Sequence, residues 1–123
     1  MPEVVELFHY EQIKEHGGIH GIRDAGMLES ALFRPQQAYS YGDPPPDLCE
    51  MAAAYAHGLA KNHPFLDGNK RTAAICCELF LNLNGLEFTV DEVVKYPQYL
   101  GLAAGEITED QFAAWLRSVT TQS

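Results

Sequence analysis

The chain has 123 residues, a length that suits one compact domain and is too short for two. Of these residues 46% are hydrophobic, which is enough for a core. The chain contains 8 lysines and arginines and 17 aspartates and glutamates, which give a net charge of −9. This charge argues against an extended surface that binds nucleic acid or an anionic membrane, although it does not exclude a local cationic pocket. No apolar run reaches the roughly 18 residues of a membrane span and no signal peptide is recognisable, so we expect a single cytoplasmic domain, residues 1–123.

The first part of the chain predicts two helices and a loop. Residues 4–16 form a helix candidate that should end at the pair of glycines that follows. Asp24 is a typical N-cap for a second, short helix, which Pro35 should close. The proline-rich residues 41–46 then predict a stiff, extended loop.

The middle of the chain predicts two more helices. Residues 47–61 have apolar side chains close to the i, i+3, i+4, i+7 spacing of an amphipathic helix. Residues of about 68–83 are apolar nearly all round, and a helix without a polar face is usually surrounded by others. We therefore expect this helix at the centre of the domain, with Asn84 and Gly85 ending it.

The three cysteines are too few for a complete disulfide framework. Cys76 and Cys77 are adjacent in the helix that we expect to be buried, and Cys49 lies elsewhere in the chain. Reduced thiols in a cytoplasmic protein are the simplest interpretation.

The last third of the chain contains two capping-box patterns, Thr89-x-x-Glu92 and Thr108-x-x-Gln111, and each should begin a helix. Pro97 should bend the first of these helices or restart it. Polar and apolar residues hardly alternate anywhere, so strands should be minor. The sequence predicts an all-α fold.

The clearest chemical pattern is residues 63–71, which lead into the N-terminus of the helix expected at the centre. Free backbone N–H groups and the helix dipole favour an anion at such a position. Gly68 lets a ligand approach the backbone closely. Three donor side chains follow at the same end: Asn69, Lys70 and Arg71. The pattern predicts a phosphate-binding site.

Two residues beside this site add the other parts of a group-transfer site. Asp67 is a hard oxygen ligand, suited to a phosphate-bound Mg²⁺, and His63 can accept a proton near neutral pH. Taken singly, each has an ordinary structural interpretation, as a cap or as a partner of a helix dipole. Together, a base, a metal ligand and a phosphate site indicate nucleotide-dependent group transfer.

Residues 63–73, HPFLDGNKRTA, resemble the signature loop of the Fic/Doc (fido) family and are most similar to that of the death-on-curing, Doc-like toxins of bacterial toxin–antitoxin pairs. Parts of residues 21–36 and of residues 105–116 are similar to other segments of these proteins, so that the resemblance covers nearly the whole chain. It implies a compact fido-type helical bundle. It also implies a short flap, a loop or hairpin near residues 39–46, that pairs with the backbone of a target.

The resemblance assigns roles to the loop residues. The catalytic residues that it implies are His63, Asp67, Lys70 and Arg71, with His63 as the base toward a protein hydroxyl and Asp67 as the Mg²⁺ ligand. The nucleotide-binding residues that it implies are Gly68, Asn69, Lys70 and Arg71. The implied cofactors are ATP and Mg²⁺.

Two departures from the Fic pattern bear on the reaction. Adenylyl-transferring Fic proteins usually have glycine in place of Lys70 and a second arginine in place of Ala74. The residues present resemble Doc, in which the γ-phosphoryl group of ATP moves to a threonine of elongation factor Tu and translation stops. Pro64 and Gly68 are ordinary Fic residues, which keeps adenylyl transfer as an alternative. A non-catalytic fido binding module is a further alternative.

The inhibitory Ser/Thr-x-x-x-Glu-Gly/Asn motif of many Fic proteins is missing from the sequence. By resemblance we therefore expect inhibition in trans by a small antitoxin. The expected partners are this antitoxin and a target similar to elongation factor Tu, without nucleic acid or membrane.

Overall fold

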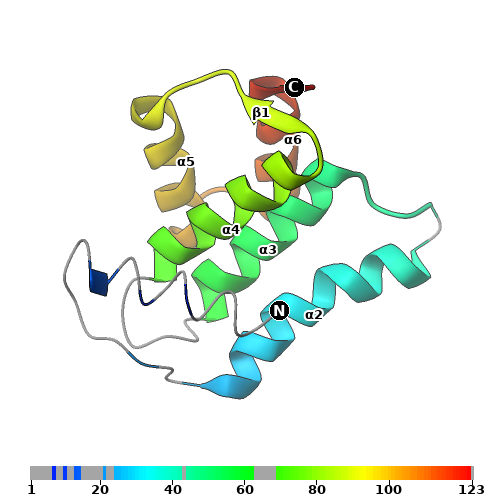
Figure 1. Ribbon diagram of the computed structural model, residues 1–123, viewed down its shortest axis with the longest axis vertical. Helices are drawn as coiled ribbons and strands as arrows, with labels where there is room; N and C mark the ends of the chain where they lie inside the picture. The colour runs from blue at the N-terminus through cyan, green and yellow to red at the C-terminus, as the bar shows by residue number, and fades with distance from the viewer. Residues whose placement is uncertain are drawn as a thin grey trace.

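The computed structural model describes residues 7, 10, 13–14, 21, 24–42, 44–62 and 69–122. Its helices in this part of the chain are α2 (Ala25–Tyr41), α3 (Leu48–Asn62), α4 (Asn69–Leu83), α5 (Glu92–Ala104) and α6 (Glu109–Val119) (Figure 1). Two short strands, β1 (Leu86–Phe88) and β2 (Thr120–Gln122), pair antiparallel. The predicted all-α fold with minor strands is confirmed. No described helix is both long and apolar enough to cross a membrane.

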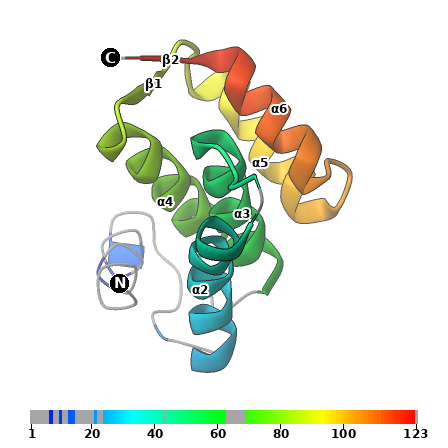
Figure 2. The same cartoon turned by 90° about the vertical axis from the view of Figure 1, so that its right-hand side faces the viewer.

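Helix α3 lies at the centre of the described helices and contacts α2, α4, α5 and α6 (Figure 2). Short side chains make this possible, since Ala52, Ala53 and Ala56 are completely buried and let neighbouring helices approach. Gly58 has the same effect toward α2, because a Cβ atom at Gly58 would lie 3.1 Å from the Cβ atom of Ala31. The helices around α3 therefore take their positions from it.

The expectation that residues 68–83 are enclosed on all sides needs a correction. Helix α4 does bury one face, with Thr72, Ala73 and Leu81 among its buried residues. Its other side lines a groove, and Leu83 at its end is 76% exposed. Apolar composition did not distinguish side chains that pack in the core from those that line a groove. The helix does end at Asn84 and Gly85, as expected, with Gly85 in a left-handed conformation at φ 85°.

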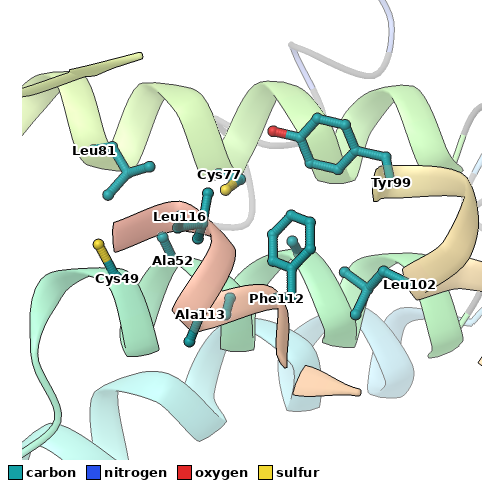
Figure 3. Packing of buried hydrophobic residues seen from close by; sticks show 11 residues of the cluster. Cys49, Ala52, Cys77, Leu81, Tyr99, Leu102, Phe112, Ala113 and Leu116 are labelled. Carbon is teal, nitrogen blue, oxygen red and sulfur yellow. The ribbon is translucent and has the colours of Figure 1, made fainter. Parts of the chain in front are cut away.

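The buried side chains form two clusters that meet along α3 and α4. The larger one joins α3, α4, α5 and α6 around Phe112, and Figure 3 shows its side chains coming together from these helices. The smaller one joins α2, α3 and α4 and contains Leu28, Leu32 and Leu59. Cys77 belongs to the larger cluster and Cys76 to the smaller one, so adjacent residues of α4 pack in different clusters.

All three cysteines are free and buried. Burial raises the pKa of the Cys76 thiol to about 12, and it also raises the pKa of the Cys49 and Cys77 thiols. Because the thiolate is the reactive form, all three thiols are chemically quiet in the folded protein.

Pro35 was expected to end a helix and Pro97 to bend one or restart it, and both residues lie inside helices. Helix α2 passes through the buried Pro35 and continues to Tyr41. Helix α5 likewise continues past Pro97.

Because α2 extends to Tyr41, residues 39–41 of the expected flap are helical, and no strand or hairpin occurs in the described residues of 39–46. After Pro35, every residue of α2 is exposed, and Tyr41 reaches 82%.

One of the two predicted capping boxes is confirmed. The amide of Gln111 donates to the Thr108 hydroxyl at 3.1 Å, and the Thr108 amide donates to the Gln111 side chain at 2.9 Å. Thr89, however, does not cap α5, because Asp91 accepts hydrogen bonds from the first turn of that helix instead. The Thr89 amide donates to the Val119 carbonyl at 2.7 Å and so ties the loop after β1 to the end of α6.

We expect Phe112→Ala to lower the free energy of unfolding by about 3–5 kcal/mol, measured by urea denaturation. Phe112 is fully buried, and its ring centroid lies 5.5 Å from that of Tyr99 and 5.4 Å from that of Trp115. Val93→Ala is the control, because Val93 is 80% exposed, and it should change stability by less than about 0.5 kcal/mol. Similar losses in the two variants would contradict this description of the core.

Candidate functional site

Three of the six predicted site residues belong to the first turn of α4. Asn69 is buried, Lys70 is exposed and Arg71 is half-buried. The other three, His63, Asp67 and Gly68, lie outside the described residues, and their roles stay predictions. The structure therefore places the side chains predicted to bind phosphate, and does not test the base or the metal ligand.

The first turn of α4 carries an unusual charge. Helix N-termini normally favour acidic side chains, and the first turns of α3, α5 and α6 all contain one. The first turn of α4 has no acidic residue, and it holds Lys70 and Arg71 instead. The positive charges of these two side chains are unfavourable beside the positive end of the helix dipole. An anion bound here would relieve this repulsion, and both the side chains and the backbone N–H groups would stabilise it. This makes a local positive site in a chain with a net charge of −9.

A groove of about 490 Å³ begins at this turn and runs between α4 and α5. Its α4 side extends from Lys70 and Arg71 to Asn82, and Tyr96 stands on its α5 side. A second hollow, of about 600 Å³, adjoins the groove at Lys70 and Leu100. Both volumes lie within the range of about 300–1,000 Å³ that is typical of small-molecule sites.

Helix α5 is attached to α4 by a network of charged and polar side chains beside the groove. The Lys95 ammonium lies 2.7 Å from Glu78 Oε1 and 3.0 Å from Glu92 Oε1. The Tyr99 hydroxyl donates to Glu78 Oε2 at 3.2 Å. Lys95 Nζ also lies 4.6 Å from the centre of the Phe88 ring, within reach of a cation–π contact.

Lys95 remains charged in this network. Burial acts to lower its pKa, but the hydrogen bonds to Glu78 and Glu92 raise the pKa of Lys95 above its usual value. Its charge compensates the Glu78 carboxylate on the wall of the groove. Sequence reasoning missed this network, because the Lys95–Glu78 contact joins two helices and leaves no local pattern. Only the spacing of Glu92 and Lys95 could have given a signal.

No group of three or more potential metal ligands lies together within the described ranges. The predicted Mg²⁺ ligand, Asp67, is outside those ranges.

The comparisons with known proteins agree on one family. Residues 2–81 match the model of the Fic/DOC family. The chain is similar to "Toxin Doc" of Mycolicibacterium smegmatis, with 43% identity over 75 residues, which cover 61% of this chain and 58% of that protein. It is also similar to "Protein kinase doc" of Escherichia phage P1, with 36% identity over 117 residues, which cover 94% of this chain and 90% of the phage protein. The chain thus matches little more than half the length of the first relative and most of the second.

Replacing the charge at the centre of the network should destabilise the protein. We expect Lys95→Met to lower the free energy of unfolding by about 3 kcal/mol, because it leaves the Glu78 carboxylate without its cation. Glu92→Gln is the matched control, since the Glu92 side chain is 81% exposed, and it should cost less than about 1 kcal/mol. Urea denaturation at neutral pH measures both, and equal losses would show that the network does not hold α5 to α4.

Proposed function

The chain belongs to the Fic/DOC family, and we propose that it is a Doc-like toxin that transfers the γ-phosphoryl group of ATP to a hydroxyl of a translation protein similar to elongation factor Tu. The observation that carries this proposal is the first turn of α4, where Lys70 and Arg71 stand at the positive end of the helix and at the mouth of a groove. A phosphate chain is the ligand that this arrangement favours. The name of the phage relative, a protein kinase, supports the same reaction class.

In the proposed reaction, His63 accepts the proton of the acceptor hydroxyl while that oxygen forms a bond to the γ-phosphorus. The bond between the γ-phosphorus and the bridging oxygen breaks, and ADP leaves. Lys70 and Arg71 hold the phosphates and stabilise the charge on the transferred group. Asp67 would hold Mg²⁺, because one carboxylate together with phosphate oxygens is the usual ligand set of this ion, which supplies further positive charge.

Ala74 supports phosphoryl rather than adenylyl transfer. It lies one turn after Lys70 and lines the groove, at the position where adenylyl-transferring Fic relatives usually carry a second arginine. With Ala74, the groove has no cation at this point. The positive charge lies instead at Lys70, one helical turn before Ala74, at the position where those relatives usually have glycine.

The proposal predicts which phosphate of ATP is transferred. Incubated with a bacterial lysate, the protein should transfer label from γ-labelled ATP and none from α-labelled ATP. His63→Ala should lower the rate by about 10²–10⁴-fold, the usual contribution of a positioned base. The variant should still be stabilised against heat by ATP with Mg²⁺, because binding by Lys70 and Arg71 does not need His63.

Other results would contradict the proposal in distinct ways. Label from the α position would make the protein an adenylyltransferase. Label from neither position would favour a non-catalytic module. Full activity of His63→Ala would exclude this residue as the base.

We further propose that a small antitoxin neutralises the protein in trans. The sequence lacks the inhibitory motif in cis, which leaves a separate protein as the source of inhibition, and one of the relatives is named as a toxin. Expressed alone, the protein should therefore arrest bacterial growth, and His63→Ala should abolish the arrest. Normal growth of cells that contain the active enzyme without a partner would contradict this proposal.

A further inference from the structure

We propose that Arg34, His57 and Glu109 form an acid-sensitive latch, which joins α2, α3 and α6 at neutral pH and releases α2 when His57 is protonated. The three side chains come from three different helices, and none of them lines the groove or belongs to the first turn of α4. The latch is therefore independent of the proposed reaction. It concerns how α2 is held against the rest of the molecule.

Glu109 is the residue at which the three helices are joined. Its carboxylate accepts two hydrogen bonds from Arg34 of α2, from Nη1 to Oε1 at 2.8 Å and from Nη2 to Oε2 at 3.2 Å. Pairing through two parallel bonds is the more specific form of an arginine–carboxylate contact. His57 of α3 reaches the same carboxylate, with Nδ1 3.3 Å from Oε1. Because Glu109 is the first residue of α6, these contacts attach the start of α6 to both other helices.

The contact between Arg34 and Glu109 is the part of the latch that holds α2 to α6. Within the described ranges, α2 packs against α3, and no comparable packing joins it to α6. Arg34 directly precedes Pro35, after which every residue of α2 is exposed, so the contact lies where the packed part of the helix ends. The Arg34 side chain is 57% exposed, and exposed ion pairs stabilise proteins only weakly. One additional charge beside this pair can therefore change the balance between the closed and the open arrangement.

Protonation would place a positive charge on His57 in surroundings that are already positive. The described charged groups that act on His57 are Glu109 from α6, Arg34 from α2 and Lys61 from the next turn of α3, whereas α4 and α5 supply none. Lys61 Nζ lies close to the end of α5, since a Cβ atom at Gly105 would be 3.0 Å from it. Two cations and one carboxylate give a net charge of +1 around the neutral ring, and a protonated ring would make it +2.

The direction of the pH effect follows from the environment of His57. Its pKa is lowered, chiefly because burial disfavours the charged ring; Glu109 acts to raise the pKa, and Arg34 and Lys61 act to lower it. A solvated histidine has a pKa of about 6.5, so the open arrangement takes up a proton more readily than the closed one. The closed arrangement is thus fully favoured above about pH 6.5 and loses stability as the pH falls below this value. Glutamate titrates near about 4.3, so Glu109 keeps its charge where His57 responds.

The first test is the titration of His57 by NMR on the full chain, with His57→Gln to identify its signals. We expect a pKa below about 6.5 in the unaltered protein. Arg34→Gln should raise this pKa, because it removes a nearby cation and leaves the contact with Glu109. Glu29→Gln is the matched control on α2, since Glu29 is exposed and makes no described contact with the latch, and it should leave the pKa unchanged.

The second test measures the distance between α2 and α6 with spin labels at Gln37→Cys and Ala114→Cys. Both positions are exposed, and the three native cysteines are buried and do not compete for the label. The distance distribution should be narrow at neutral pH and broader at about pH 5.5, where histidines gain charge. With His57→Gln it should stay narrow at both pH values, and with Glu109→Gln it should be broad at both. Far-UV circular dichroism checks that every variant keeps its helices.

Each measurement can contradict the latch. A His57 pKa of about 6.5 or higher, or one that Arg34→Gln leaves unchanged, would show that protonation does not oppose the closed arrangement. A distance distribution that is the same at both pH values in the unaltered protein would show that acid does not release α2. Broadening that persists in His57→Gln would assign the acid response to another group, and a narrow distribution in Glu109→Gln would show that this carboxylate does not hold the two helices together.

Discussion

The close approach of helices to α3 is the constraint on which the rest of the described structure depends. Ala52, Ala53 and Ala56 are fully buried, and Gly58 lies so close to α2 that an added Cβ atom would come within 3.1 Å of the Ala31 Cβ atom. Larger residues here would force the surrounding helices apart, since overpacked cores relax by shifting backbone. Because α4 is packed directly on α3, this small-residue surface also determines where the first turn of α4, with Lys70 and Arg71, lies.

The groove follows from the way α4 and α5 are held. Both helices contribute side chains to the larger core cluster on one side, including Cys77 and Leu102, and the Lys95–Glu78 contact joins them beside the groove. The groove thus lies on the outer side of a packed core, as is typical of preformed ligand sites. Its charges are arranged in order, with cations at the start of α4 and carboxylates toward the start of α5. An acidic protein can therefore attract an anion to one defined place.

Local patterns in the sequence predicted the helices well, and interactions between distant residues explain the errors. Periodicity and the capping box at Thr108 depend only on neighbouring residues, and they gave the right helices. Pro35 was expected to end α2, but its burial against the core outweighs the lost backbone hydrogen bond. Thr89 has the right spacing for a cap, but its amide and hydroxyl bond to Val119, about thirty residues away.

The same distinction applies to the candidate site. The residues proposed to bind phosphate, Asn69, Lys70 and Arg71, are contiguous, so the motif alone suggested them, and the structure groups them in one helical turn. The groove and the network around Lys95 could not be predicted, because they arise only when α5 packs against α4. The exposed end of α2, beyond Pro35, has a different consequence. No side chain there is buried, so its turns are held chiefly by backbone hydrogen bonds, and their opening would cost far less than global unfolding. This segment can therefore rearrange around an incoming molecule while the core stays intact.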